Sequence, residues 1–337
     1  MSAYIKAISY HLPSKIFRNE DFYVSFPDAV AQKDNYTRIG VKERRIVDPE
    51  LLASDLAVEA AKALFREHHI KPSEIDFILF CALEFDHMFP ASVSFIQEKL
   101  GIPASCGGLD YSLGCSGYVY GLSLAKGLVE SVGMKNVLLL TSSTLTKKIH
   151  KKDRSSRFVF GDAAAATLIS SRENSKGISS FVFGTDGKMA DRIIIRDGGA
   201  RNPISENSFI EQENEHGNVT CDANLYMDGA AVFHFGLKTV PQMINDLLAK
   251  EKMNINDVDL FIFHQANLFL IDTIRTKMKI PEEKVFNYME KVGNTVAASI
   301  PITLQEAITA GKAKPGQKIL VAGFGVGLSW AATIVRL

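Results

Sequence analysis

A single cysteine joins a strand-like segment to a helix-like segment in Leu109-Asp-Tyr-Ser-Leu-Gly-Cys115-Ser-Gly-Tyr118. Beyond it, apolar residues recur at roughly helical spacing, at Tyr118, Leu122, Ala125, Leu128 and Val129. The pattern predicts that Cys115 lies at a helix N-terminus, where unpaired N–H groups and the helix dipole favour a thiolate. Gly114 and Gly117 permit a sharp turn there. This is the arrangement of a nucleophile elbow, which presents a reactive side chain to a substrate.

The other three cysteines have sequence surroundings typical of small buried residues. Cys81 follows an apolar run, Cys106 stands at the start of a strand pattern, and Cys221 lies in a polar stretch. No group of Cys and His has the spacing of a metal site, so we expect no bound metal. Four cysteines in 337 residues also make no disulfide framework, which indicates a reducing compartment.

The composition is that of a globular protein without a strong charge of either sign. Hydrophobic residues make up 46% of the chain, and 38 Lys and Arg balance 38 Asp and Glu. Proteins whose main partner is nucleic acid normally carry a basic excess, so we expect no such partner. The N-terminal residues lack the pattern of a secretion signal, and no segment offers about 18 uncharged apolar residues. We therefore expect a cytoplasmic protein that does not bind membranes.

Apolar strand patterns alternate with helical patterns along the whole chain. Strands are predicted at Tyr4–Ser9, Phe77–Ala82, Cys106–Tyr111, Val137–Thr141, Ala163–Ile169, Ile178–Phe183, Leu260–Phe263, Ile319–Gly323 and Ser329–Val335. Helices are predicted at Asp55–Arg66, Ser92–Leu100, Gly117–Ser131, Ala230–Lys250, Leu270–Met278 and Ile302–Ala310. This alternation predicts an α/β protein with mostly buried sheets. The similar order of elements predicts a duplicated core, with one half over 1–174 and the other over 175–337.

Two further segments hold residues suited to catalysis. Leu260-Phe-Ile-Phe-His264-Gln-Ala-Asn267 places a histidine at the C-terminal end of a predicted strand, where α/β proteins place their chemistry. Val292-Gly-Asn294-Thr-Val-Ala-Ala-Ser299-Ile-Pro301 places an asparagine after a glycine and before a helix of small residues. Taken alone, His264 is typical of a structural histidine and Asn294 of a helix N-cap.

Together, the three motifs resemble a known catalytic triad. Cys115 in Gly-Cys-Ser-Gly, His264 in His-Gln-Ala-Asn and Asn294 in Gly-Asn-Thr resemble the Cys–His–Asn triad of the β-ketoacyl-acyl carrier protein synthase III family, within the thiolase superfamily. Matching blocks are Thr37-Arg-Ile-Gly-Val-Lys-Glu-Arg-Arg45, Phe160-Gly-Asp-Ala163 and Gly323-Phe-Gly-Val-Gly-Leu-Ser-Trp330. The resemblance implies the thiolase-like layered αβαβα fold, two pseudo-duplicated halves that meet at a central active site, and a homodimer.

The resemblance also implies a ping-pong mechanism. Cys115 would take an acyl group from acyl-coenzyme A or another acyl thioester. His264 and Asn294 would donate hydrogen bonds to the thioester oxygen of malonyl-carrier protein as it loses carbon dioxide. The oxyanion at the acyl carbon would meet the N–H of Cys115 and one from the loop Phe324–Gly327, with Val326 as the expected donor. Metal and cofactor are not needed, acyl carrier protein is the expected partner, and the pathway is fatty-acid synthesis or specialised lipid or polyketide synthesis.

The same resemblance assigns three more residues to substrate binding. Arg38 lies in the block that begins at Thr37, and Arg154 matches an arginine beside the adenine of coenzyme A. Phe89 matches a phenylalanine that crosses the dimer interface and closes the partner's acyl tunnel. The basic run Lys147–Arg157 either attracts phosphates or forms a solvated loop.

Several residues depart from the family pattern. Typical members stack the adenine on a tryptophan before the Thr-Arg-x-Gly block, whereas the only tryptophan here is Trp330. Phe269, His234 and Ala230 stand where an arginine, a lysine and an asparagine are expected. Losing a stacking platform removes about 1–3 kcal/mol of binding energy. We therefore expect a specialised paralogue that prefers carrier-bound or unusual acyl groups to short acyl-coenzyme A.

Two other functions use the same residues differently. A related acyltransferase would pass the acyl group from Cys115 to an oxygen or nitrogen nucleophile, without decarboxylation. A scaffold partner would have no activity, and the intact triad argues against it. A nicotinamide site is disfavoured because Gly323-x-Gly325-x-Gly327 lacks the dinucleotide-binding spacing and no further unit follows it.

Overall fold

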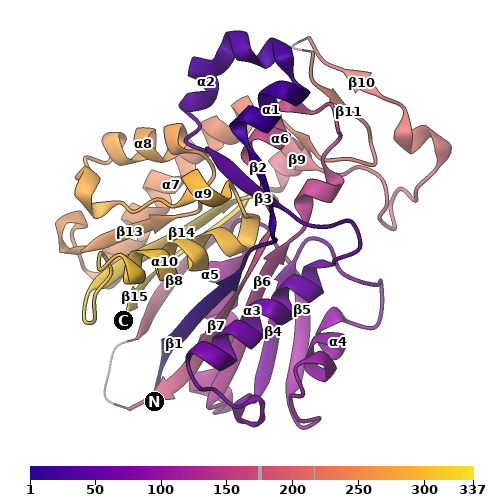
Figure 1. The fold of residues 1–337 in the computed structure, drawn as a ribbon. Coiled ribbons are helices and arrows are strands. Elements are labelled where there is room, and N and C mark those ends of the chain that lie inside the picture. Colours follow the sequence, from indigo (N-terminus) through magenta and orange to yellow (C-terminus); the bar gives the residue numbers. More distant parts are fainter. Residues whose placement is uncertain (174–176, 216) are drawn as a thin grey trace.

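Two β-sheets form the centre of the fold (Figure 1). The computed structural model describes residues 1–173, 177–215 and 217–337. Within these residues, the first sheet contains, in spatial order, β1 (Ser2–His11), β7 (Ala163–Arg172), β6 (Asn136–Ser143), β4 (Phe77–Ala82) and β5 (Gly107–Ser112). The second contains β13 (Leu260–Phe263), β14 (Lys318–Gly325), β15 (Ser329–Arg336) and β8 (Ile178–Thr185).

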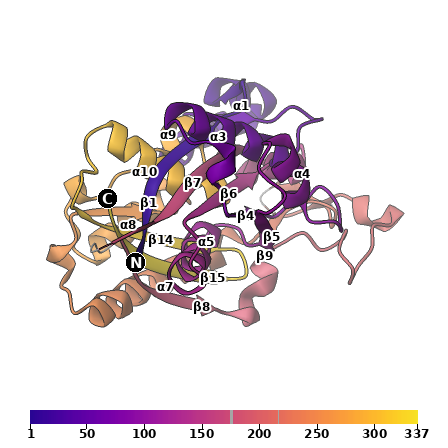
Figure 2. The same cartoon turned by 90° about the horizontal axis from the view of Figure 1, so that it is seen from below.

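Helices cover both faces of each sheet, giving five layers. The helices α3 (Ala53–Glu67) and α4 (Ser92–Lys99) pack on the outer face of the first sheet. Two helices lie between the sheets, namely α5 (Gly117–Gly127) and α10 (Ser299–Thr309), and Figure 2 shows α5 between the strands of the two sheets. On the outer side of the second sheet, α7 (Gly229–Glu251) packs on the strands and α8 (Leu268–Lys277) packs on α7. The predicted αβαβα layering is confirmed.

Burial on both faces explains the continuous apolar runs in the strands. In β4, Ile78 and Phe80 face the outer layer with α3, whereas Leu79 packs in the core between the sheets. In β13, Ile262 faces that central core and Phe263 faces the outer layer with α7. Sheets covered on both sides have no polar face, so their strands do not alternate between apolar and polar residues.

The two sheets repeat one topology. In the first, β4 and β6 are parallel, and β6–β7 and β7–β1 are antiparallel. In the second, β13 and β14 are parallel, and β14–β15 and β15–β8 are antiparallel. The central helices α5 and α10 precede the equivalent strands β6 and β14. This correspondence is the pseudo-duplication that the sequence predicts, although the boundary predicted between residues 174 and 175 lies outside the described residues and stays a prediction.

All predicted strands and helices are present, with ends shifted by a few residues. The helix predicted to reach Ser131 ends at Gly127 and continues as a π-helical turn over Leu128–Val132. The prediction missed short elements, which are too short to show a periodic pattern in the sequence. They are β2 (Lys15–Arg18), α1 (Asn19–Ser25), α2 (Lys33–Thr37), β3 (Glu43–Ile46), α6 (Arg154–Val159), β9 (Ile193–Ile194), β10 (Gln212–Glu213), β11 (Val219–Thr220), β12 (Tyr226–Met227) and α9 (Met289–Val292).

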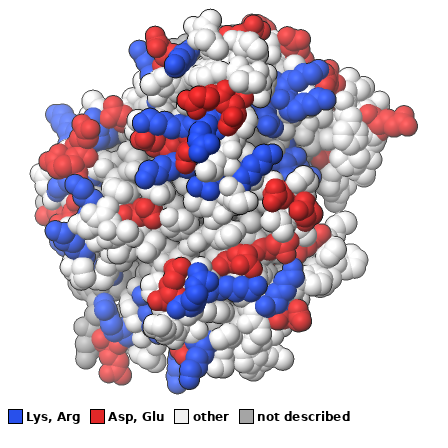
Figure 3. Space-filling view, viewed as in Figure 1, with Lys and Arg blue, Asp and Glu red and all other residues white. Residues whose placement is uncertain are grey.

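The surface agrees with the balanced composition. Figure 3 shows Lys and Arg interspersed with Asp and Glu over one face of the molecule. Several of these charges are paired, for example Lys42 with Glu290 at 2.7 Å and Lys99 with Asp55 at 2.6 Å.

No helix among the described residues has the length and apolar character needed to cross a bilayer.

Candidate active site

Cys115 lies in the sharp turn between β5 and α5, as predicted. The strand ends at Ser112, the helix begins at Gly117, and the N–H of Gly117 donates to the carbonyl of Gly114 at 2.8 Å. Close packing leaves no room for a side chain at either glycine. A Cβ on Gly114 would lie 2.5 Å from Val326, and a Cβ on Gly117 would collide with the sulfur of Cys81. The turn therefore holds Cys115 against the C-terminal loop that contains Val326.

The protonation state of Cys115 differs from the expectation. Burial raises the pKa of the Cys115 thiol to about 12, whereas hydrogen bonds from the backbone N–H groups of Val326 and of Cys115 itself lower this pKa. The free energy needed to remove a thiolate from water exceeds the stabilisation that the two N–H groups give it. The prediction that this position favours a thiolate is therefore wrong, and Cys115 is a thiol at neutral pH.

His264 follows β13 and is buried beneath the same loop. Its N–H donates to the carbonyl of Ala322 at 2.8 Å, and its Nδ1 lies 2.7 Å from the hydroxyl of Ser299 at the start of α10. The imidazole meets the ring of Phe324 edge to face, with 5.8 Å between centroids. Burial lowers the pKa of His264 to about 3, although a hydrogen bond to the Val296 backbone raises it. The imidazole is therefore neutral at physiological pH.

Asn294 is held by backbone pairing with the Phe160 segment. Its N–H donates to Val159 at 2.9 Å, and its carbonyl accepts the N–H of Gly161 at 3.0 Å. A Cβ on Gly293 would lie 2.7 Å from the Val159 carbonyl, so this approach requires glycine. The Asn294 Oδ1 accepts the N–H of Val296 at 2.9 Å, which leaves the Nδ2 amide as the donor end of the side chain.

Neighbouring residues join these three positions into one site. Val296 binds the Asn294 side chain, contributes the backbone group near His264, and packs in one apolar cluster with Cys115. On the other side, Gly325 follows Phe324, which contacts His264, and a Cβ on Gly325 would lie 2.6 Å from the Cys115 Sγ. The structure therefore brings the three segments of the predicted triad together.

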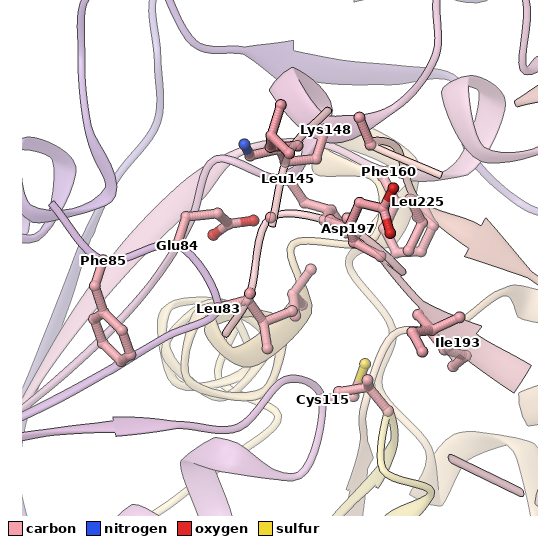
Figure 4. A pocket seen from close by; sticks show the side chains of 18 residues that line it. Leu83, Glu84, Phe85, Cys115, Leu145, Lys148, Phe160, Ile193, Asp197 and Leu225 are labelled. Atoms are coloured by element: carbon pink, nitrogen blue, oxygen red, sulfur yellow. The ribbon is translucent and has the colours of Figure 1, made fainter. Parts of the chain in front are cut away.

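Cys115 opens onto a cavity of about 550 Å³ (Figure 4). Val326 and Val296 line it beside Cys115, and most of the remaining wall is apolar. Leu83, Leu145, Phe160, Ile193 and Leu225 make up much of that wall. A cavity of this size and character suits a small or medium apolar ligand.

Three charged residues in the wall were not assigned to this cavity from the sequence. Glu84, Lys148 and Asp197 also line the cavity. Glu84 had a usable signal, because it stands two residues beyond the apolar strand Phe77–Ala82, where α/β proteins place functional groups. Lys148 was predicted only as one member of a basic run, and Asp197 lies in a segment without a periodic pattern.

The other predicted substrate-binding residues lie outside this wall. Arg38 is exposed in the turn after α2, and Phe89 is 83% exposed in the loop between β4 and α4. Arg154 begins α6 and lines a separate cavity with Lys152, Glu211 and other residues. Their assignment to substrate binding remains a prediction, and for Phe89 it requires a second subunit.

In the basic run, Lys152 pairs with Glu211 at 2.6 Å.

None of the four cysteines forms a disulfide. Cys81 is fully buried behind the turn, and its thiol donates to the Leu113 carbonyl at 3.1 Å. Over residues 1–173, 177–215 and 217–337, no three His, Cys, Asp or Glu side chains form a metal-binding group.

Comparison with known proteins places this architecture in one family. Residues 109–187 match 3-oxoacyl-[acyl-carrier-protein (ACP)] synthase III, and residues 248–337 match the C-terminal part of that family. The β-ketoacyl-[acyl-carrier-protein] synthase III of Caldanaerobacter subterraneus subsp. tengcongensis is 35% identical over 328 residues, 97% of this chain and 95% of that protein.

Solved structures agree over the full length. A crystal structure of a 3-oxoacyl-(acyl-carrier-protein) synthase III is 43% identical and superposes with a TM-score of 0.98, covering 100% of both chains. The 3-oxoacyl-(acyl-carrier protein) synthase of Burkholderia xenovorans LB400 is 33% identical, with a TM-score of 0.91 over 100% of this chain and 94% of that chain. The chain therefore belongs to the 3-oxoacyl-[acyl-carrier-protein] synthase III family of condensing enzymes.

Proposed function

We propose that this protein condenses an acyl group carried on Cys115 with a malonyl thioester, releasing carbon dioxide. The observation that carries the proposal is the position of the Cys115 sulfur. It lies at a cavity lined mainly by apolar residues, and the N–H groups of Val326 and of Cys115 lie near enough to lower its pKa. Two fixed N–H donors beside a nucleophile are suited to an oxyanion at an acyl carbon.

In the first half-reaction, the Sγ of Cys115 attacks the carbonyl carbon of an acyl thioester. The new bond joins Sγ to the acyl carbon, the bond to the donor sulfur breaks, and the donor leaves as a thiol with the proton that Cys115 gives up. The N–H groups of Cys115 and Val326 stabilise the tetrahedral oxyanion. The donor is acyl-coenzyme A or an acyl group on a carrier protein, with Arg38 and Arg154 assigned to binding it.

In the second half-reaction, a malonyl group on acyl carrier protein loses its carboxylate as carbon dioxide. The electron pair of the broken bond forms an enolate, whose oxygen accepts hydrogen bonds from neutral His264 and from the Asn294 amide. The enolate carbon then bonds to the acyl carbon, the bond from that carbon to Sγ breaks, and the departing Cys115 thiolate takes up a proton from water. These steps use side chains and backbone N–H groups alone, so no cofactor is proposed.

The proposal includes a homodimer and a cytoplasmic location. Phe89, with its side chain almost fully exposed beside exposed Met88, is suited to enter the acyl cavity of a second subunit. A reducing compartment such as the cytoplasm keeps a nucleophilic thiol free.

Carboxyl-labelled malonyl-carrier protein tests the proposal after the enzyme has been acylated. Release of one labelled carbon dioxide for each new carbon–carbon bond supports decarboxylative condensation. Transfer of the acyl group to an oxygen or nitrogen acceptor without labelled carbon dioxide would instead establish the acyltransferase function.

A further inference from the structure

Glu84 lines the Cys115 cavity, and the proposed mechanism does not use its carboxyl group. The residue lies in the loop that follows β4. Figure 4 shows its carboxylate among the lining side chains, between Leu83 and Leu145. Most of this wall is apolar, and burying a carboxyl group without partners costs free energy.

Both carboxylate oxygens of Glu84 are buried, and neither accepts a hydrogen bond from a described residue. The N–H groups of Thr144 and of Glu84 itself lie near enough to lower its pKa, but neither makes a hydrogen bond of normal geometry. Buried polar groups in native proteins are nearly always paired, so an exception calls for an explanation.

Glu84 differs in this respect from two other carboxylates nearby. Asp197, in the same wall, accepts a hydrogen bond from the Ser208 hydroxyl at 2.7 Å. Buried Asp162 accepts the N–H of Val47 at 2.9 Å and that of Thr146 at 3.1 Å. Only Glu84 among these three lacks a partner in the described part of the chain.

Burial, together with the charges nearby, keeps Glu84 near the balance between its protonated and ionised forms. Burial raises the pKa of Glu84 to about 7, nearby Asp162 adds to the increase, and Lys148 opposes it. The ionised form accepts hydrogen bonds only, whereas the protonated form also donates one. A hydroxyl group can pair with either form, and an ammonium group pairs with the ionised form.

We propose that Glu84 selects acyl groups that carry a polar hydrogen-bonding substituent, a hydroxyl or amino group, on the chain held in this cavity. The inference rests on the proposed function, since it concerns the acyl group attached to Cys115. A hydrocarbon chain fills the cavity but leaves both oxygens of Glu84 unpaired. Sites built to hydrogen-bond a substituent discriminate strongly against analogues that lack it, for this reason.

Matched pairs of thioesters test the selection directly. Each ω-hydroxyacyl-coenzyme A and each ω-aminoacyl-coenzyme A is compared with the alkanoyl-coenzyme A in which a methyl group replaces the polar group, over a series of chain lengths. The rate of Cys115 acylation is measured by intact mass. At the chain length that reaches Glu84, we expect the polar member to acylate the enzyme at least about tenfold faster.

Substitutions at Glu84 identify the group responsible. Glu84→Leu should reverse the preference in favour of the alkanoyl member. Glu84→Gln should retain the preference for hydroxyl and lose the preference for amino, because the amide forms hydrogen bonds but has no charge. The control is Glu98→Gln, which makes the same change at an exposed glutamate outside the cavity wall and should leave both preferences unchanged.

Two outcomes distinguish a failure of this inference from a failure of the proposed condensing function. If alkanoyl thioesters acylate Cys115 as fast as their polar partners at every length, or if Glu84→Leu keeps the wild-type preference, the inference is overturned and the condensing function stands. If no thioester acylates Cys115 at all, both are overturned.

Discussion

Gly325 and Cys115 are in such close contact that no side chain fits between them. A Cβ atom added to Gly325 would lie 2.6 Å from the Sγ of Cys115 and 2.7 Å from its Cβ. The position of Cys115 therefore requires the glycine, and the sequence Gly323-Phe-Gly325 is explained by this approach of a backbone strand to Cys115.

Replacing this glycine should damage acyl transfer without unfolding the protein. In Gly325→Ala, the new methyl group must displace the Cys115 side chain, and a displacement of about 1 Å in a reacting group costs up to roughly 10²-fold in rate. We expect acylation of Cys115 to slow by at least about tenfold, measured by intact mass. Gly187→Ala is the control, because a Cβ there meets open space. Wild-type acylation rates in Gly325→Ala would contradict the geometry.

His264 and Asn294 should affect the two half-reactions unequally. Their proposed donors act on the enolate oxygen, so His264→Ala and Asn294→Ala should retain acylation of Cys115 and lose condensation by about 10²-fold or more. Single-turnover acylation and carbon dioxide release are measured separately. Equal losses in both steps would show that the two residues only support the fold.

The buried thiol predicts a steep pH dependence of chemical modification. Because burial raises the pKa of Cys115 to about 12, the reactive thiolate is a small fraction that increases about tenfold per pH unit below that value. Alkylation by iodoacetamide, followed at the Cys115 peptide, should rise in this way from pH 7 to pH 10. A plateau near pH 7 would instead indicate the stabilised thiolate that the sequence alone led us to expect.

Glu84 should make the wild-type protein less stable at alkaline pH. Its folded-state pKa of about 7 lies above the usual value for glutamate, so the stabilisation present at low pH is lost as the pH rises through about 7. A tenfold difference in proton affinity between the folded and unfolded states corresponds to about 1.4 kcal/mol of stability. Glu84→Gln should therefore gain thermal stability relative to wild type at pH 8.5 and not at pH 4.5.

Calorimetry of both proteins at the two pH values measures the difference in melting temperature. The control substitution is Glu98→Gln, which makes the same chemical change at an exposed position outside the cavity wall. A pH-independent difference for Glu84→Gln would mean that Glu84 titrates as an ordinary exposed glutamate.

Much of the fold was predictable because the sheets are buried on both faces. Short apolar runs such as Phe77–Ala82 and Leu260–Phe263 have the length of buried strands rather than of helices, and their bounds agree with the structure. The turn at Cys115 was predictable because Gly114 and Gly117 lie within two residues of it in the sequence.

The protonation of Cys115 and the isolation of Glu84 were not predictable in this way. Both properties depend on how completely segments distant in the sequence bury the Cys115 sulfur and the Glu84 carboxylate. Val326 lies more than two hundred residues from Cys115, and the groups that influence Glu84 include Thr144 and Asp162. Hydrogen-bond partners at such separations cannot be read from local sequence patterns. The roles of Arg38 and Phe89 concern a substrate and a second subunit, so a single chain does not determine them.

The central claim is that Cys115 carries the acyl group, and intact mass spectrometry tests it most directly. After incubation with an acyl thioester, the wild-type protein should gain the mass of one acyl group, located on the Cys115 peptide and removed by malonyl-carrier protein. Cys115→Ala should keep the wild-type circular dichroism spectrum and gain no mass. An acyl adduct that forms on Cys115→Ala at the wild-type rate would contradict the account.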